Sequence, residues 1–138
     1  MVSGRRWWQT ESASSFTDEP VCRHILSVCN DKNNPIKSTV PVSAYSDIAL
    51  TYAQKSELKE AALKHYGPLF ERLGQQYPEL KEKDFFYCYL CLLELDNVQI
   101  SALMQKSIST IWDRESRLKR IFGSKDKVSF VLHRFMND

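Results

Sequence analysis

Two pairs of cysteines come closest to a chemical motif in this chain. Cys88 and Cys91 have the C-x-x-C spacing of metal clips and redox pairs, and Cys22 and Cys29 would supply two further thiolates. Metal-binding C-x-x-C knuckles usually lie in turns, however, whereas this pair lies in the apolar run 85–93. We therefore expect the four cysteines to be small core residues, with no metal site and no cofactor.

The remaining reactive residues do not form a known catalytic or phosphate-binding motif. The four glycines are too far apart for a G-x-G-x-x-G loop or a P-loop, and His24, His65 and His133 are scattered along the chain. No H-E-x-x-H or G-x-S-x-G pattern is present. We therefore expect that the protein is not an enzyme, and the sequence indicates no small-molecule substrate.

The composition is that of a globular protein with a core of its own. With 138 residues, 43% of them hydrophobic, the chain is long enough to fold as one domain without disulfide bonds. The apolar run 85–93 is far shorter than the ~20 residues that span a bilayer. Residues 1–17 contain no apolar segment of a signal peptide, so we expect a cytoplasmic protein.

The apolar residues recur with helical spacing, and no stretch of useful length alternates as a β-strand does. We therefore predict an all-α fold. In the first half we expect helices from about residue 18, from about 45, and from 56 to a stop at Gly67, followed by a short helix before Pro78. In the second half we expect helices at 82–94, 97–104, 108–122 and 126–135.

These elements divide the chain into three parts. Residues 1–17 are rich in Ser and Thr and show no sustained period, so we expect a flexible tail. We expect a helical N-terminal segment over 18–80 and a DNA-binding helix-turn-helix domain over 81–138. The domain prediction rests on the helices 97–104 and 108–122, because a turn of only three residues joins them.

The expected helix 108–122 has two contrasting faces. With Leu118 at the centre of one face, Ile111 and Phe122 lie within about 40° of it, since each residue turns the helix by about 100°. Small hydroxyls, an aromatic ring and three cations on the outer side suit insertion into a DNA major groove. The residues that we predict to face the bases are Ser109, Trp112, Asp113, Ser116 and Arg120.

Positive charge gathers around the same helix. Residues 105–134 contain eight cations and three anions, a net charge of +5, whereas the whole chain carries only +2. Phosphate binding requires such a local excess, although a basic outer face is also common on helices that are merely solvated. The residues that we predict to contact phosphates are Lys106, Ser107, Arg117, Lys119 and Lys125.

The stretch 80–123 resembles the C-terminal helix-turn-helix of the LuxR/GerE class, in the branch found in membrane-anchored, TPR-containing bacterial regulators. Its "QISALM" is similar to the family's "EIAxLL", and its "SISTIWDRESRLKRIFG" to "SxxSVxxxRxRLxKKLFG". The preceding "HYGPLFERLGQQYPEL" resembles the lead-in "NYxxFxERLxxLYPxL". Sigma-factor region 4 shares much of this pattern. The chain departs from it at Glu94, where the family usually has Gly, at Ser101, where it has Ala, and at Arg114 and Glu115.

The resemblance implies a four-helix unit without a wing, whose last helix pairs two subunits. The apolar residues of that helix are Val128, Val131, Leu132 and Phe135, at i, i+3, i+4 and i+7 spacing. They form a candidate dimer face. Packing within their own domain is an equally good explanation.

Taken together, these patterns predict a bacterial transcription regulator that binds double-stranded DNA with helix 108–122. The alternative is a degenerate helix-turn-helix that binds protein, such as RNA polymerase or a partner regulator, because Asp113 and Glu115 add negative charge to the expected interface. Salt separates the two functions, since phosphate binding falls steeply with ionic strength and an apolar protein interface does not.

Overall fold

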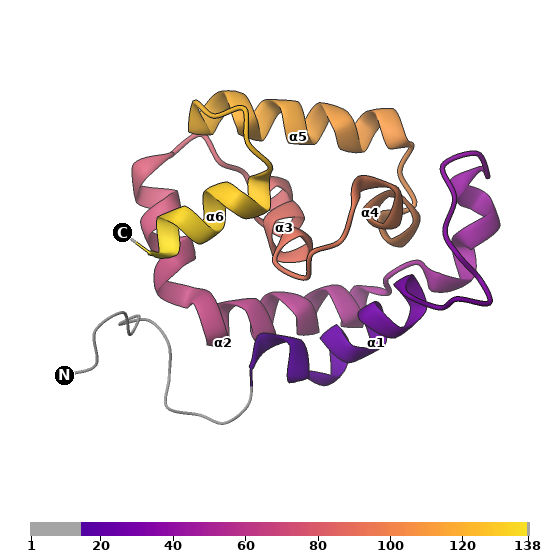
Figure 1. Ribbon diagram of the computed structural model, residues 1–138. Helices are drawn as coiled ribbons and strands as arrows, with labels where there is room; N and C mark the ends of the chain where they lie inside the picture. The colour runs from indigo at the N-terminus through magenta and orange to yellow at the C-terminus, as the bar shows by residue number, and fades with distance from the viewer. Residues whose placement is uncertain (1–14, 138) are drawn as a thin grey trace.

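The computed structural model describes residues 15–137, which contain helices and no β-strand (Figure 1). The predicted all-α class is therefore confirmed for this part of the chain. None of the described helices is both long and apolar enough to cross a membrane. The elements are the 3-10 helices η1 (Phe16–Asp18) and η2 (Val42–Ile48) and the α-helices α1 (Pro20–Cys29), α2 (Tyr52–Gln76), α3 (Glu82–Cys91), α4 (Asn97–Met104), α5 (Ile108–Phe122) and α6 (Val128–Met136).

The last residues of the predicted tail pack against the helices. Phe16 is only 3% exposed, and its ring meets that of Tyr66 edge-on at a centroid distance of 5.4 Å. This aromatic contact holds η1 against α2. The rest of the predicted tail, residues 1–14, lies outside the described residues.

Helix α2 consists of two helical arms that meet at a kink. We expected two helices separated by a stop at Gly67, and the backbone departs from helical geometry one residue earlier, at Tyr66 (φ −133°), before it continues as helix to Gln76. Pro68 explains the bend, because its ring and missing N–H disturb the preceding turn. The second arm of α2 brings Tyr77 edge-on to Phe122 of α5, at 5.1 Å between ring centroids.

Local signals fix the ends of α4 and α5. The Asp96 carboxylate accepts a hydrogen bond from the amide of Gln99, whose side chain returns to the Asp96 amide, forming a capping box at the start of α4. At the start of α5, the Ser107 hydroxyl accepts from the Thr110 amide. Helix α5 ends at Gly123, which has the left-handed conformation (φ 65°) typical of helix C-termini.

One hydrophobic cluster includes buried side chains from η1 and from all six α-helices. The predicted segments 18–80 and 81–138 therefore share a single core. The four cysteines belong to it, with exposures of 0–6%, so the prediction that they are core residues is confirmed. Burial raises the pKa of the Cys22 and Cys29 thiols to about 12. Residues 15–137 contain no cluster of three or more His, Cys, Asp or Glu side chains that would hold a metal ion.

The link between α3 and α4 contains a strained residue. Helix α3 ends at Cys91 rather than at the predicted Glu94, and Glu94 has a left-handed backbone (φ 60°). This conformation is costly for a residue with a side chain and free for glycine. The LuxR/GerE pattern usually has Gly at this position, and a glycine would adopt the left-handed backbone without strain.

We predict that Glu94→Gly raises the free energy of unfolding by about 0.5–1 kcal/mol, because relief of the left-handed strain exceeds the added flexibility of the unfolded chain. Urea denaturation would measure the change. Glu94→Gln is the matched control, since it also removes the negative charge beside His133 (3.2 Å) but keeps the strain. A glycine variant no more stable than the glutamine variant would contradict the prediction.

Candidate nucleic-acid interface

The turn between α4 and α5 is closed by backbone and side-chain hydrogen bonds. Gln105 adopts the left-handed conformation (φ 53°), and the amide of Lys106 donates to the Ser101 carbonyl at 3.1 Å. The Gln105 side chain donates to the Ala102 carbonyl (2.9 Å) and to the Val42 carbonyl (2.8 Å). The turn is therefore held in one geometry and is also attached to η2.

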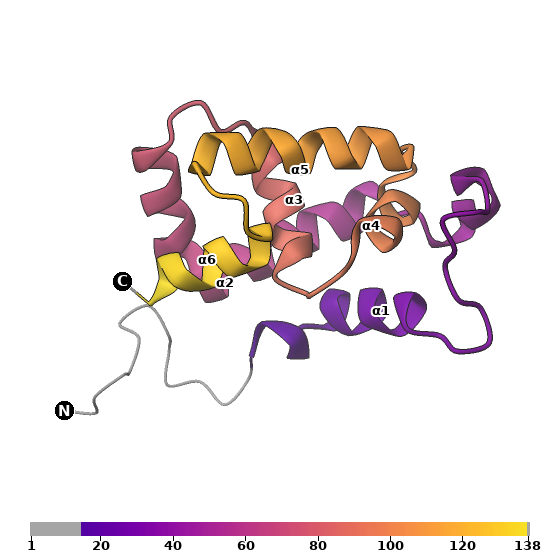
Figure 2. The same ribbon diagram turned by 45° about the horizontal axis from the view of Figure 1, so that its top comes forward.

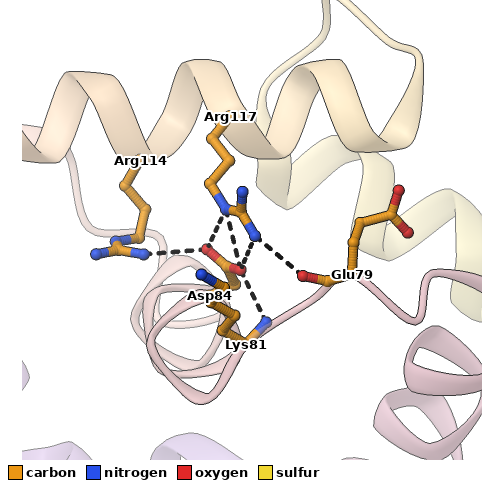
Figure 3. A network of polar contacts seen from close by, with 5 residues as sticks. All are labelled: Glu79, Lys81, Asp84, Arg114 and Arg117. Carbon is orange, nitrogen blue, oxygen red and sulfur yellow. Dashed lines mark hydrogen bonds and ion pairs between the residues drawn. The ribbon is translucent and has the colours of Figure 1, made fainter.

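A buried carboxylate holds α5 against the beginning of α3 (Figure 3). Asp84 is fully buried and accepts from Arg114 Nη1 at 3.0 Å and from Arg117 Nη2 at 3.2 Å and Nε at 3.3 Å. It also accepts from the Lys81 amide at 2.9 Å, while Arg117 Nη2 donates to the Glu79 carbonyl at 3.0 Å. These contacts fix both the rotation and the position of α5.

The charge state of Asp84 follows from its partners. Burial alone raises the pKa of this carboxyl, but hydrogen bonds from Arg117, from the Lys81 amide and from Arg114 outweigh it and hold the pKa below its ordinary value. Asp84 is therefore ionised at neutral pH and compensated by two guanidinium groups. An ion pair of this kind is costly to break from one side, because the remaining charges lose their partner.

A second chain of hydrogen bonds joins the same three helices. The Tyr87 hydroxyl of α3 donates to Asn97 Oδ1 at 2.6 Å, and Asn97 Nδ2 at the start of α4 donates to Glu115 of α5 at 3.1 Å. Arg114 and Glu115, where the chain departs from the LuxR/GerE pattern, thus both have partners within the protein. Their side chains position α5 rather than project from it.

The outer face of α5 is open to solvent. In Figures 1 and 2 the helix runs along one edge of the molecule, with α3 and α4 on its inner side. Its inner residues Ile111 and Leu118 are 4% and 0% exposed, whereas Trp112 is 56% exposed. The five residues predicted to face the bases, namely Ser109, Trp112, Asp113, Ser116 and Arg120, are all exposed.

The residues predicted to contact phosphates differ in their exposure and in whether they are already paired within the protein. Lys106 and Lys125 are exposed, and Lys119 is half-buried on one flank of α5. The hydroxyl of Ser107 caps α5, although the residue is exposed. Arg117 must be removed from the phosphate set, because its guanidinium binds Asp84 and the Glu79 carbonyl. The sequence pattern could not reveal this pairing, since Asp84 lies on another helix.

The candidate dimer face is not exposed. Its four residues are at most 8% exposed and belong to the chain's own interior, which agrees with the alternative of packing within one domain and not with a contact surface between subunits. Phe135, for example, receives Arg72 over its ring at 4.6 Å. The residues concerned are Val128, Val131, Leu132 and Phe135.

Sequence reasoning also missed a neighbour of the interface. The loop before η2 lies beside the start of α5, where Lys37 and Ser38 line a hollow of about 200 Å³ together with Ser107 and Ile108. Local sequence patterns could not predict this neighbour, because about 70 residues separate the two segments.

Comparison with known proteins finds no related protein or similar structure. No family model matches the chain, and neither a curated protein nor a solved structure shows a significant match. The likeness to LuxR/GerE regulators therefore rests on the sequence patterns alone.

We predict that Asp84→Asn lowers the free energy of unfolding by about 2–3 kcal/mol, somewhat less than the ~3–5 kcal/mol typical of fully buried pairs. The smaller value is expected because Arg114 and Arg117 are 23% and 31% exposed and recover some hydration. Urea or thermal denaturation would measure it. Asp113→Asn, on the exposed face of the same α5, is the control and should change stability by less than about 0.5 kcal/mol. Equal effects would contradict the structural role of Asp84.

The same pair predicts a pH dependence. Because the folded-state pKa of Asp84 is lowered, its stabilising contribution is present above the unfolded-state pKa of about 4 and is lost as the pH falls through the folded-state value. The difference in unfolding free energy between wild type and Asp84→Asn should be largest above about pH 5 and shrink toward pH 2. Denaturation curves across this range measure it, and a difference independent of pH would refute the assignment.

Proposed function

We propose that this protein is a DNA-binding transcription regulator that inserts α5 into the major groove. The observation that carries the proposal is the contrast between the two faces of α5: Asp84 and the core fix the inner face, while the five predicted base-facing side chains are exposed. A major groove about 12 Å wide admits one α-helix, provided that its outer face is uncovered.

The chemistry of the exposed face is suited to reading bases. Ser109 and Ser116 are small and allow close approach, and their hydroxyls donate or accept hydrogen bonds. Arg120 is exposed and offers the bidentate donors that bind guanine O6 and N7. Asp113 offers an acceptor for the cytosine amino group, and the Trp112 ring offers apolar contact with a thymine methyl group.

Phosphate binding is assigned to a smaller set than the sequence predicted. Lys106 precedes α5, Lys119 lies in its last turn, and Lys125 follows it. These three cations occur at both ends of the helix, so they would bind backbone on both sides of the base contacts. Such contacts set position and register but carry no sequence information.

The second candidate function is a protein-binding module. It is favoured by exposed apolar groups near α5, namely Trp112 at 56% and Tyr52 at 86%. Tyr52 borders a hollow of about 570 Å³ that is also lined by Phe86 and Met104. Aromatic and methionine side chains are enriched in protein interfaces. RNA polymerase and a partner regulator remain the proposed partners for this alternative.

We predict that the protein binds a labelled random-sequence duplex, with an affinity that falls roughly 40-fold between about 50 and about 200 mM salt if three cations contact phosphates. Lys106→Ala and Lys119→Ala should each reduce the slope of log affinity against log salt by about 0.9. Fluorescence anisotropy would measure both quantities.

Lys64→Ala is the matched control for these variants, because Lys64 is an exposed lysine of α2 that pairs with Glu19 beside α1. It should leave the salt slope unchanged. Absence of binding by folded protein at about 50 mM salt would refute the regulator function and favour the protein-binding module. If all three variants reduced the salt slope equally, the effect would not be specific to α5, and α5 would not be the DNA interface.

A further inference from the structure

The loop before η2 is an ordered structure and not a loose connection. The Lys37 amide donates to the Tyr45 hydroxyl at 2.9 Å, and that hydroxyl lies 3.5 Å from the Pro35 carbonyl, so one ring closes the loop over ten residues. Within it, the Val40 amide donates to the Lys37 carbonyl at 3.3 Å and forms a turn. The side chain of Lys37 therefore projects from a defined backbone.

This loop is attached to the helix-turn-helix itself. Gln105 of the α4–α5 turn donates to the Val42 carbonyl at 2.8 Å, and the Leu50 amide donates to the Leu103 carbonyl at 2.9 Å. In both ribbon views the chain between α1 and α2 lies beside the end of α5 that follows α4 (Figures 1 and 2). Any movement of the turn would carry the loop with it.

The loop lies where it would affect how α5 fits into a major groove. Recognition helices contact bases mainly through their N-terminal residues, so an element beside that end lies over the adjacent DNA backbone. Lys37 and Ser38 line the same hollow as Ser107 and Ile108, at the N-terminal end of α5. A loop at this place either contacts the backbone or obstructs it.

The charge of the loop favours contact. Lys37 is exposed and forms no ion pair with any of residues 15–137. Ser38 and Thr39 follow it, and both are exposed hydroxyl residues that donate hydrogen bonds to phosphate oxygens. Residues 36–42 contain no carboxylate that would repel a phosphate.

We propose that the turn at 37–40 is a second DNA-contacting element, in which the Lys37 ammonium group binds a backbone phosphate next to the bases read by the first turn of α5. This inference rests on the proposed function. It extends the interface beyond the four C-terminal helices, and it gives the N-terminal half of the chain a direct part in binding.

The test is anisotropy with the random-sequence duplex and the full chain, at about 50 and about 200 mM salt. Loss of one phosphate contact lowers the salt slope by about 0.9, so the affinity of Lys37→Ala should change about 3- to 4-fold less over this range than that of wild type. Lys37→Arg should restore the wild-type slope. Lys32→Ala is the matched control, since Lys32 is exposed in the same loop but does not line the hollow beside α5.

The outcomes separate the two proposals. If wild type binds with a steep slope and Lys37→Ala has the same slope, or binds more tightly, the second contact is refuted and the proposed function stands. Equal losses in Lys37→Ala and Lys32→Ala also refute it, because the effect would be one of overall charge. If folded wild-type protein does not bind DNA at low salt, both proposals fail. Circular dichroism of each variant checks that the helices are intact.

Discussion

The packing of α5 against α3 depends on the buried carboxylate of Asp84. An ionised group with no solvent contact requires partners, and Arg114 and Arg117 supply them from one side of α5. Since these arginines are three residues apart, they lie on neighbouring turns of the helix, and both can reach one carboxylate only in one rotation of α5. The ion pair thus decides which side chains of α5 point outward, a specificity that the apolar core alone enforces less strictly.

Ion pairs within the protein reduce the positive charge that is left to bind phosphates. Three of the eight cations in 105–134 pair within the protein, namely Arg114 and Arg117 with Asp84, and Arg134 with Asp126. Asp84 lies outside that window, so the local excess overstates the charge available to phosphates. The cations left without an ion pair among residues 15–137 occur near both ends of α5, which is a more specific arrangement than a uniformly basic face.

Local signals allowed much of the second half to be predicted. The caps of Asp96 and Ser107 and the stop at Gly123 are decided by residues within one turn, and the predicted bounds of α4 and α5 are confirmed. Apart from the end of α3, which lies at Cys91 rather than Glu94, the errors concern contacts between distant residues. Phe16 is fixed by Tyr66, Arg117 by Asp84, and the α6 stripe by the rest of the core, and no periodicity within one helix reports such partners.

Four residues at which the chain departs from the LuxR/GerE pattern have structural explanations in this protein. Glu94 occupies a strained link, Ser101 is buried and donates to the Val98 carbonyl, and Arg114 and Glu115 bind α3 and α4. All four have local or internal explanations, and none of them is among the five exposed residues assigned to base contacts. Arg114 and Glu115 hold α5 in one orientation through their contacts with Asp84 and Asn97. The departures therefore concern the placement of α5 and not the chemistry of its outer face.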